Sequence, residues 1–115
     1  MFLKGKTALI TGSTSGIGLG YANALAAEGA QVMINGFGDQ TAIDGYVSEL
    51  TAISGTGALH SAADMTKPDE IRAMVADCTE KLGAPDILIN NAGIQHVAPV
   101  DEFPEDKWEA ILAII

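Results

Sequence analysis

The sequence predicts an α/β fold, in which a parallel sheet carries helices on both faces. Short apolar runs alternate along the 115 residues with stretches of helical spacing. The run 87–89, Ile-Leu-Ile, is continuously apolar, which is typical of a parallel strand buried on both faces. Glycine-bearing loops at 11–18 and 90–93 follow two of these runs. With 48% hydrophobic residues, the chain can bury one modest core, so we expect one domain or part of one.

The first predicted unit is a strand, a helix and a second strand. The strand is expected at 7–11, and an alanine-rich helix follows at 17–28. Gly29 closes this helix, because glycine readily ends a helical turn. The next apolar run predicts a strand at 31–35.

A second helix is expected at 42–53. Its apolar face carries four residues at helical spacing: Ile43, Val47, Leu50 and Ile53. Thr41 with Asp44 offers a capping pair at its start. Gly55 and Gly57 are expected to end it.

The third strand is expected at 58–62, and a third helix follows it. Thr66, Pro68 and Asp69 open this helix, and Gly83 stops it. Its predicted apolar face consists of Ile71, Met74, Val75, Cys78 and Leu82.

The chain ends with a fourth strand and a fourth helix. The strand is expected at 86–90. The helix begins near Pro104, and its apolar residues are Trp108, Ile111 and Leu112. Right-handed crossovers place the strands in the order 3-2-1-4, so the carboxyl ends of the first and fourth strands flank the crevice where open α/β sheets bind ligands.

The loop 11–18, Thr-Gly-Ser-Thr-Ser-Gly-Ile-Gly, predicts a nucleotide site. Gly12 permits a tight turn, and Gly16 and Gly18 remove side chains that would keep a pyrophosphate from the N–H groups at a helix start. A purely structural role in turns and packing is the alternative for these glycines.

Charge and cysteine content exclude several classes of protein. The net charge of −9, from 15 acidic and 6 basic residues, argues against a nucleic-acid partner. No apolar run is long enough for a membrane helix, and no metal-ligand set stands out. The single cysteine, Cys78, fits a reducing compartment, so we expect a cytoplasmic protein with an inert, buried thiol.

These motifs resemble the short-chain dehydrogenase/reductase family, which has a Rossmann-like, doubly wound parallel sheet. The family's form Thr-Gly-x-x-x-Gly-x-Gly matches 11–18, its Asn-Asn-Ala-Gly motif matches 90–93, and Asp64 stands where the family has an adenine-contacting aspartate. The resemblance implies diphosphate and ribose contacts by Gly12, Ser13, Thr14, Ser15, Gly16, Ile17 and Gly18. It implies adenine contacts by Asp64 and Met65, and contacts on the ribose and nicotinamide side by Asn91, Ala92 and Gly93.

More ordinary roles remain open for some of these residues. Asp64 is alternatively a solvated loop carboxylate or a cap. Asn90 and Asn91 are alternatively a pair that stabilises a turn.

The phrases 12–20, 35–38 and 93–99 are similar to the branch of this family that interconverts D-3-hydroxybutyrate and acetoacetate. This resemblance makes Gln95 a contact of the substrate carboxylate, and an amide donor suits an anion. A loop side chain that bonds the backbone is the alternative for Gln95. For His96, a surface or packing role is favoured.

The segment 35–40, Asn-Gly-Phe-Gly-Asp-Gln, selects the cofactor. NADP needs a basic residue near its 2′-phosphate, and this segment has none, so NAD is predicted. Phe37 is expected to pack beside the adenine, with a plain packing role as its alternative. Asp39 is the weaker candidate for the ribose hydroxyls.

The family's catalytic residues are not among these 115. Its Tyr-x-x-x-Lys pair is absent, because Tyr21 and Tyr46 are followed four residues on by Leu25 and Leu50. Ile115 stands where the family has a helix asparagine. We therefore expect 1–115 to be the dinucleotide-binding N-terminal part of a longer enzyme, which the resemblance implies is a tetramer. A catalytically inactive NAD-binding protein and an acidic interaction module are the alternatives.

Overall fold

The computed structural model describes residues 1–93 and 98–114. Strands and helices alternate in the predicted order. The elements are β1 (Thr7–Ile10), α1 (Gly16–Ala27), β2 (Gln31–Asn35), α2 (Gln40–Ser54), β3 (Ala58–Ser61), α3 (Pro68–Lys81), β4 (Ile87–Ile89), the 3₁₀ turn Val100–Glu102 and α4 (Glu105–Ile114).

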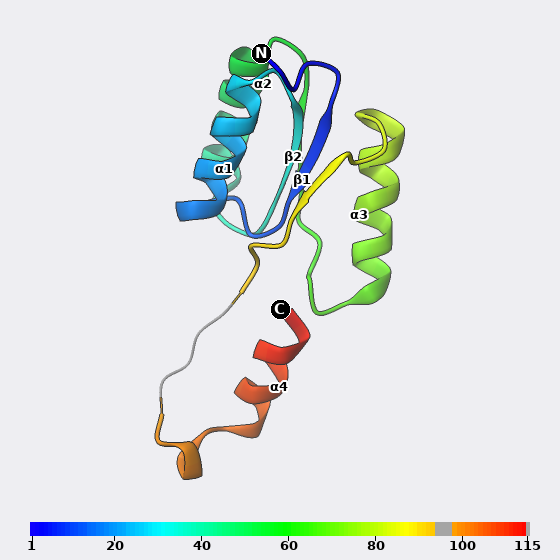
Figure 1. Cartoon of the computed structure of the whole chain (residues 1–115). Coiled ribbons are helices and arrows are strands. Elements are labelled where there is room, and N and C mark those ends of the chain that lie inside the picture. Colours follow the sequence, from blue (N-terminus) through cyan, green and yellow to red (C-terminus); the bar gives the residue numbers. More distant parts are fainter. Residues whose placement is uncertain (94–97, 115) are drawn as a thin grey trace.

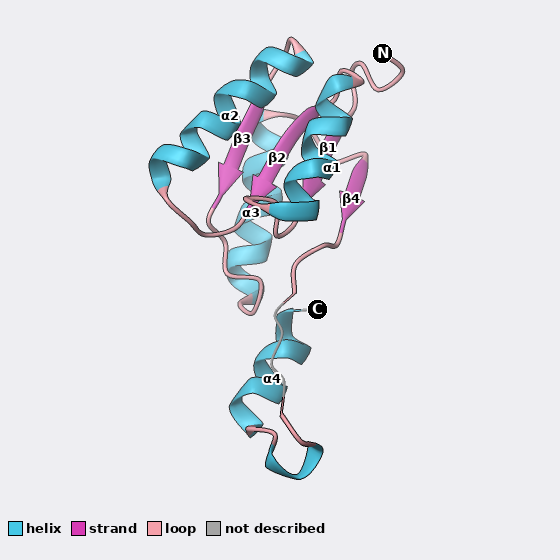
Figure 2. Ribbon diagram, turned by 90° about the vertical axis from the view of Figure 1, so that its left-hand side faces the viewer, coloured by secondary structure: helices cyan, strands magenta, loops and turns pink. Residues whose placement is uncertain are grey.

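The four strands form one parallel sheet in the order β3-β2-β1-β4. Figure 1 shows α1 and α2 on one face of this sheet and α3 on the other. The α/β fold class and the strand order 3-2-1-4 are thus confirmed. All strands point the same way, so the loops after β1, β2, β3 and β4 gather at one edge of the sheet (Figure 2).

Two buried clusters hold the layers together. On the α1 side, Ala22 and Ala26 are fully buried against β1 and β2, and their small side chains let the helix approach the sheet closely. On the α3 side, Met74 and Cys78 pack with Leu9 and Met33. Burial, followed by the charge of Asp77, raises the pKa of the Cys78 thiol, so this thiol stays protonated and inert, as expected.

The predicted start of α2 is wrong. The helix begins at Gln40, and the side chain of Asp39 caps it by accepting a hydrogen bond from the Ala42 N–H at 3.0 Å. Asp44 instead accepts a bond from the Gln40 side chain at 2.8 Å. Asp39 is the cap because it precedes the first turn, where its side chain reaches a free N–H group. At the other end, Gly55 caps the helix with φ 73°, as expected.

Strand β4 was expected to be buried on both faces, and this is not what the structure shows. Leu88 is 57% exposed, while Ile87 and Ile89 are half-buried. Helix α3 packs on the strands β1 and β2 and does not cover Leu88. Val75 of α3, predicted on its apolar face, is likewise 39% exposed.

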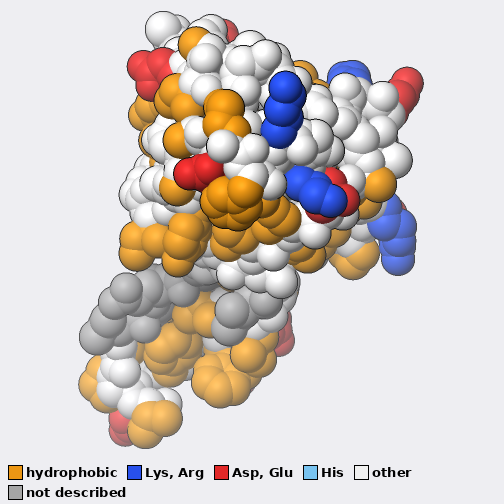
Figure 3. Space-filling model, turned by 45° about the horizontal axis from the view of Figure 1, so that its top comes forward, with side chains coloured by type: hydrophobic (Ala, Val, Ile, Leu, Met, Phe, Trp, Pro, Cys, Tyr) orange, Lys and Arg blue, Asp and Glu red, His pale blue; other side chains and the backbone are white. Residues whose placement is uncertain are grey.

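Helix α4 begins one residue after Pro104, close to its predicted start. It extends beyond the carboxyl edge of the sheet (Figure 2). Phe103 and Trp108 meet edge to face with ring centroids 6.3 Å apart, but Trp108 and Leu112 remain largely exposed. Figure 3 shows hydrophobic side chains gathered on this extending part of the molecule. Within the described ranges, no helix has the length and apolarity that crossing a membrane requires.

Candidate functional site

A groove of about 300 Å³ lies at the carboxyl ends of β1 and β2. The loops that follow β1, β2, β3 and β4 all contribute to its lining. It is lined by Gly12, Thr14, Ser15, Asn35, Gly36, Phe37, Ala63, Met65, Ala92, Gly93 and Ile114. Seven of these were predicted from the sequence as site residues: Gly12, Thr14, Ser15, Phe37, Met65, Ala92 and Gly93.

Close approach of other backbone atoms explains two of the glycines in and after the β1–α1 loop. Gly12 has φ 59°, and a Cβ on it would lie 2.9 Å from the Cα of Ala92. A Cβ on Gly18 would meet the Gly12 carbonyl oxygen and lie 2.9 Å from the Cα of Ser13. Only glycine fits at these two positions without moving backbone atoms. Gly16 differs, since it has φ 56° and open space around it.

The two glycine-bearing loops are hydrogen-bonded to each other. The Thr11 hydroxyl accepts bonds from the N–H groups of Asn91 and Ala92, each at 3.0 Å. The Asn91 side chain donates to the Gly12 carbonyl at 3.0 Å. The amide nitrogen of Asn91 thus ties its own loop to the β1–α1 loop.

Asn35, at the end of β2, is a site residue that the sequence analysis missed. It is 1% exposed, and its side chain bonds two neighbouring segments, the β1–α1 loop and the end of β3 with the loop after it. Its Oδ1 accepts a bond from the Gly12 N–H at 3.2 Å. Its Nδ2 donates to the carbonyls of Ser61 at 3.1 Å and Ala63 at 3.0 Å. A polar residue that ends an apolar central strand was the available signal.

Ser13 is fully buried and continues this network. Its N–H donates to the Asn35 carbonyl at 2.6 Å, and its hydroxyl donates to the Ile10 carbonyl at 2.6 Å. The same hydroxyl accepts the Asn35 N–H at 2.9 Å. The polar groups of Ser13 are therefore engaged in holding the loop, whereas Thr14 and Ser15 line the groove.

The start of α1 offers the groove free donors. Ser15 stands at the N-cap without a side-chain capping bond, and the first turn holds no acidic residue. Free N–H groups and the positive end of the helix dipole favour an anion here. Ile17 is 72% exposed and, like Gly16 and Gly18, is not part of the groove lining.

Of the predicted adenine contacts, Met65 lines the groove and Asp64 does not. Asp64 Oδ1 accepts bonds from the hydroxyl of Thr66 at 2.7 Å and from its N–H at 2.9 Å. These bonds lower the pKa of Asp64. The carboxylate stabilises its own turn and stays an acceptor down to low pH.

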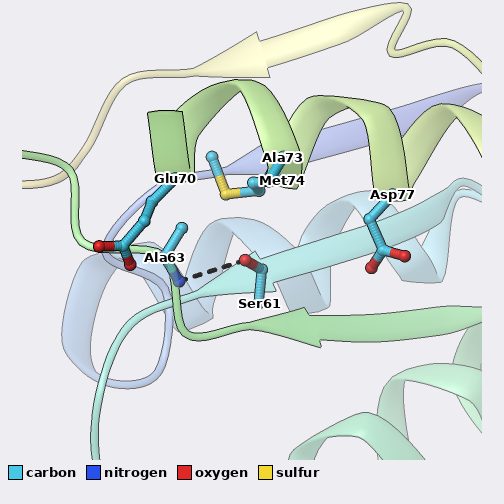
Figure 4. Close-up of a pocket in the computed structure, with 6 residues that line it drawn as sticks. All are labelled: Ser61, Ala63, Glu70, Ala73, Met74 and Asp77. Atoms are coloured by element: carbon cyan, nitrogen blue, oxygen red, sulfur yellow. Dashed lines mark hydrogen bonds between the residues drawn. The ribbon is translucent and has the colours of Figure 1, made fainter. Parts of the chain in front are cut away.

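A second hollow lies between α3 and the end of β3 (Figure 4). Ser61 and Ala63 form one wall, where the Ala63 N–H donates to the Ser61 hydroxyl at 3.2 Å. Glu70 and Asp77 line the other wall, and none of its described lining residues is Lys or Arg. Two carboxylates disfavour a phosphate, so the groove is the better candidate for an anionic ligand.

Gln95 and His96 lie outside the described residues. No cluster of three or more His, Cys, Asp or Glu side chains placed to hold a metal ion occurs in 1–93 and 98–114.

A family model described as short chain dehydrogenase matches residues 6–114. The chain belongs to the short chain dehydrogenases. It is 52% identical to the D-beta-hydroxybutyrate dehydrogenase of Cupriavidus necator over 97% of this chain and 43% of that protein. It is 48% identical to the enzyme of the same name from Rhizobium meliloti, over 95% of this chain and 42% of that one. The chain thus spans less than half the length of these relatives.

Solved structures agree with the fold. A blue fluorescent protein from a metagenomic library, in complex with NADPH, superposes on 99% of this chain and 47% of its own, with a TM-score of 0.93 and 34% identity. A short chain dehydrogenase from Burkholderia cenocepacia, in complex with NADP, covers 97% of this chain and 45% of its own, with a TM-score of 0.90 and 37% identity. The sheet of this chain is therefore Rossmann-like, and its family binds nicotinamide dinucleotides.

Proposed function

We propose that this chain is the dinucleotide-binding part of an NAD-dependent oxidoreductase that interconverts a short 3-hydroxy acid and its 3-keto acid. The proposed pair is D-3-hydroxybutyrate and acetoacetate. The observation that carries the proposal is the 52% identity to a D-beta-hydroxybutyrate dehydrogenase over 97% of the chain.

The groove suits a dinucleotide because the loop after β1 borders it and leads into the start of α1, whose free N–H groups favour a phosphate. In the proposed arrangement, the diphosphate lies along the loop 12–18 at the start of α1. Phe37, Met65 and Asp64 flank the adenosine end, and the loop 91–93 flanks the nicotinamide end. When bound, the nicotinamide ring supplies the hydride acceptor.

NAD is proposed over NADP because of charge. No Lys or Arg is among the described residues that line the groove, so a 2′-phosphate beside Phe37 would lack a cationic partner there. Asp39 caps α2 two residues further on and adds a negative charge. The neighbours that hold NADPH or NADP are only 34% and 37% identical.

The catalytic serine, tyrosine and lysine of the family motif are not among residues 1–115. We therefore propose that 1–115 binds the cofactor and that hydride transfer needs residues beyond these. A homo-oligomer is part of the proposal, and the exposed apolar residues Trp108 and Leu112 of α4 support it. A cytoplasmic location is also part of the proposal, and the single reduced thiol of Cys78 supports it.

Replacing Gln95 by alanine tests the substrate assignment. In the complete polypeptide that carries this sequence, loss of an amide bonded to the substrate carboxylate should remove roughly 1.5–3 kcal/mol. We expect kcat/KM for D-3-hydroxybutyrate to fall by about one to two decades, while the affinity for NAD stays unchanged.

Gln40→Ala is the matched control, because it makes the same change at an exposed position of α2. The 115 residues alone serve as a blank and should form no NADH. If kcat/KM for D-3-hydroxybutyrate is unchanged in Gln95→Ala, Gln95 no longer supports a 3-hydroxy acid as the substrate. A complete polypeptide that binds NAD without oxidising any hydroxy acid would instead favour a non-catalytic NAD-binding protein.

A further inference from the structure

The loop 36–38, between β2 and α2, is anchored at three backbone positions. Gly36 donates its N–H to the Ser61 carbonyl at 3.3 Å. The Gly36 carbonyl lies 2.7 Å from Nε2 of His60. The Phe37 carbonyl accepts a bond from the Thr14 hydroxyl at 2.9 Å. Consecutive peptide groups of this loop are thus bonded to two different neighbouring elements.

His60 provides the contact with the Gly36 carbonyl through its side chain. It lies on β3, half-buried, where its backbone is paired with Ile34 of β2. A carbonyl oxygen only accepts hydrogen bonds, so the contact with Gly36 assigns the ring proton to Nε2. Its imidazole thus reaches from β3 across the end of β2.

Phe37 lies on this anchored loop with its side chain exposed. Its side chain is 68% exposed and lines the groove, although its backbone is held in place. An aromatic ring on a mobile loop would lose conformational freedom when a ligand packs against it. A ring on an anchored loop avoids most of that cost, so the anchors contribute to ligand affinity without touching the ligand.

We propose that His60 is a positioning residue for the cofactor, which holds the loop 36–38 so that Phe37 forms a preorganised surface for the adenosine end. This inference rests on the proposed function, since it concerns the same groove. It adds a residue from β3 that no motif of the sequence includes.

The test separates the two halves of the cofactor. AMP and nicotinamide mononucleotide are titrated separately into the complete polypeptide by ligand-observed NMR. In His60→Ala, we expect AMP to bind about 3- to 10-fold more weakly, the change that one lost hydrogen bond commonly causes. Nicotinamide mononucleotide should bind as to the parent, and kcat at saturating NAD should not change.

Two amide variants and one strand variant act as controls. Gln places its amide nitrogen near the position of His Nε2, so His60→Gln should restore AMP binding, whereas the shorter His60→Asn should not. Ala58→Gly weakens the same strand two residues earlier, away from the loop, and should leave the AMP affinity unchanged. If His60→Ala does not fold, the contrast between the Gln and Asn variants decides.

Three results would overturn the inference: equal AMP binding by parent and His60→Ala, parallel losses of both half-cofactors, or equal behaviour of the Gln and Asn variants. If the parent binds AMP and one of these three results is found, the role of His60 is rejected and the proposed function is not. A parent that binds neither AMP nor NAD rejects the proposed function as well.

Discussion

Replacing Gly18 by alanine is expected to abolish dinucleotide binding and to lower the free energy of unfolding by about 1–3 kcal/mol, the usual cost of overpacking. The added Cβ would meet the Gly12 carbonyl oxygen, would lie 2.6 Å from Nδ2 of Asn91, and would lie 2.9 Å from the Cα of Ser13. The Asn91 side chain can rotate away, but the two backbone atoms cannot yield without moving the loop 12–14. The loop would then lose the geometry that faces the diphosphate.

Gly20→Ala provides a matched control in the same helix. A Cβ on Gly20 would point into open space, with nothing outside its own stretch of helix within 4 Å, and its φ is not positive. Alanine there should raise the stability by roughly 0.5–1 kcal/mol, since glycine in a helix interior costs about that much. Chemical denaturation and NAD titration of both variants give the comparison. Equal effects of the two substitutions would show that the close approach at Gly18 is not a constraint.

Asn35→Ala is expected to cost about 2 kcal/mol or more of stability and to weaken cofactor binding strongly. The substitution leaves the Gly12 N–H and the Ala63 carbonyl without their partner. The Ser61 carbonyl loses the bond from Asn35 but keeps the one from the Gly36 N–H. Each buried group left unsatisfied costs about 1–3 kcal/mol. Because these groups belong to the β1–α1 loop and to the end of β3 with the loop after it, the loss acts on the site as well as on the fold.

Asn90→Ala makes the same chemical change at the exposed position that follows β4. We expect a change within about 0.5 kcal/mol, as for most surface substitutions. Urea unfolding of the two variants measures the difference directly. A small effect in Asn35→Ala would mean that water replaces the side chain and that the network does not hold the loops.

The strand order could be predicted from the sequence because it follows from local apolar patterns and from the handedness of the connections. Alternating apolar runs and helical stretches, with right-handed crossovers, leave few arrangements for four parallel strands. The contact between the two glycine loops also follows from this order, and the close approach of Gly12 to Ala92 confirms it.

The missed features depend on contacts across the fold. The Asn35 side chain bonds three backbone groups that are 23 to 28 residues away in the sequence, and His60 reaches Gly36 over 24 residues. The start of α2 was misplaced because Asp39 and Thr41 are both plausible caps in sequence, and the backbone decides between them. The exposure of Leu88 depends on where α3 packs, which its own periodicity does not specify.

Isothermal titration of the complete polypeptide with NAD and with NADP tests the central claim most directly. The base-free groove predicts that NAD binds and that NADP binds at least about tenfold more weakly, a difference of about 1.4 kcal/mol. NADP binding equal to or tighter than that of NAD would contradict the assignment of the loop 35–40, and no binding of either would contradict the assignment of the groove itself.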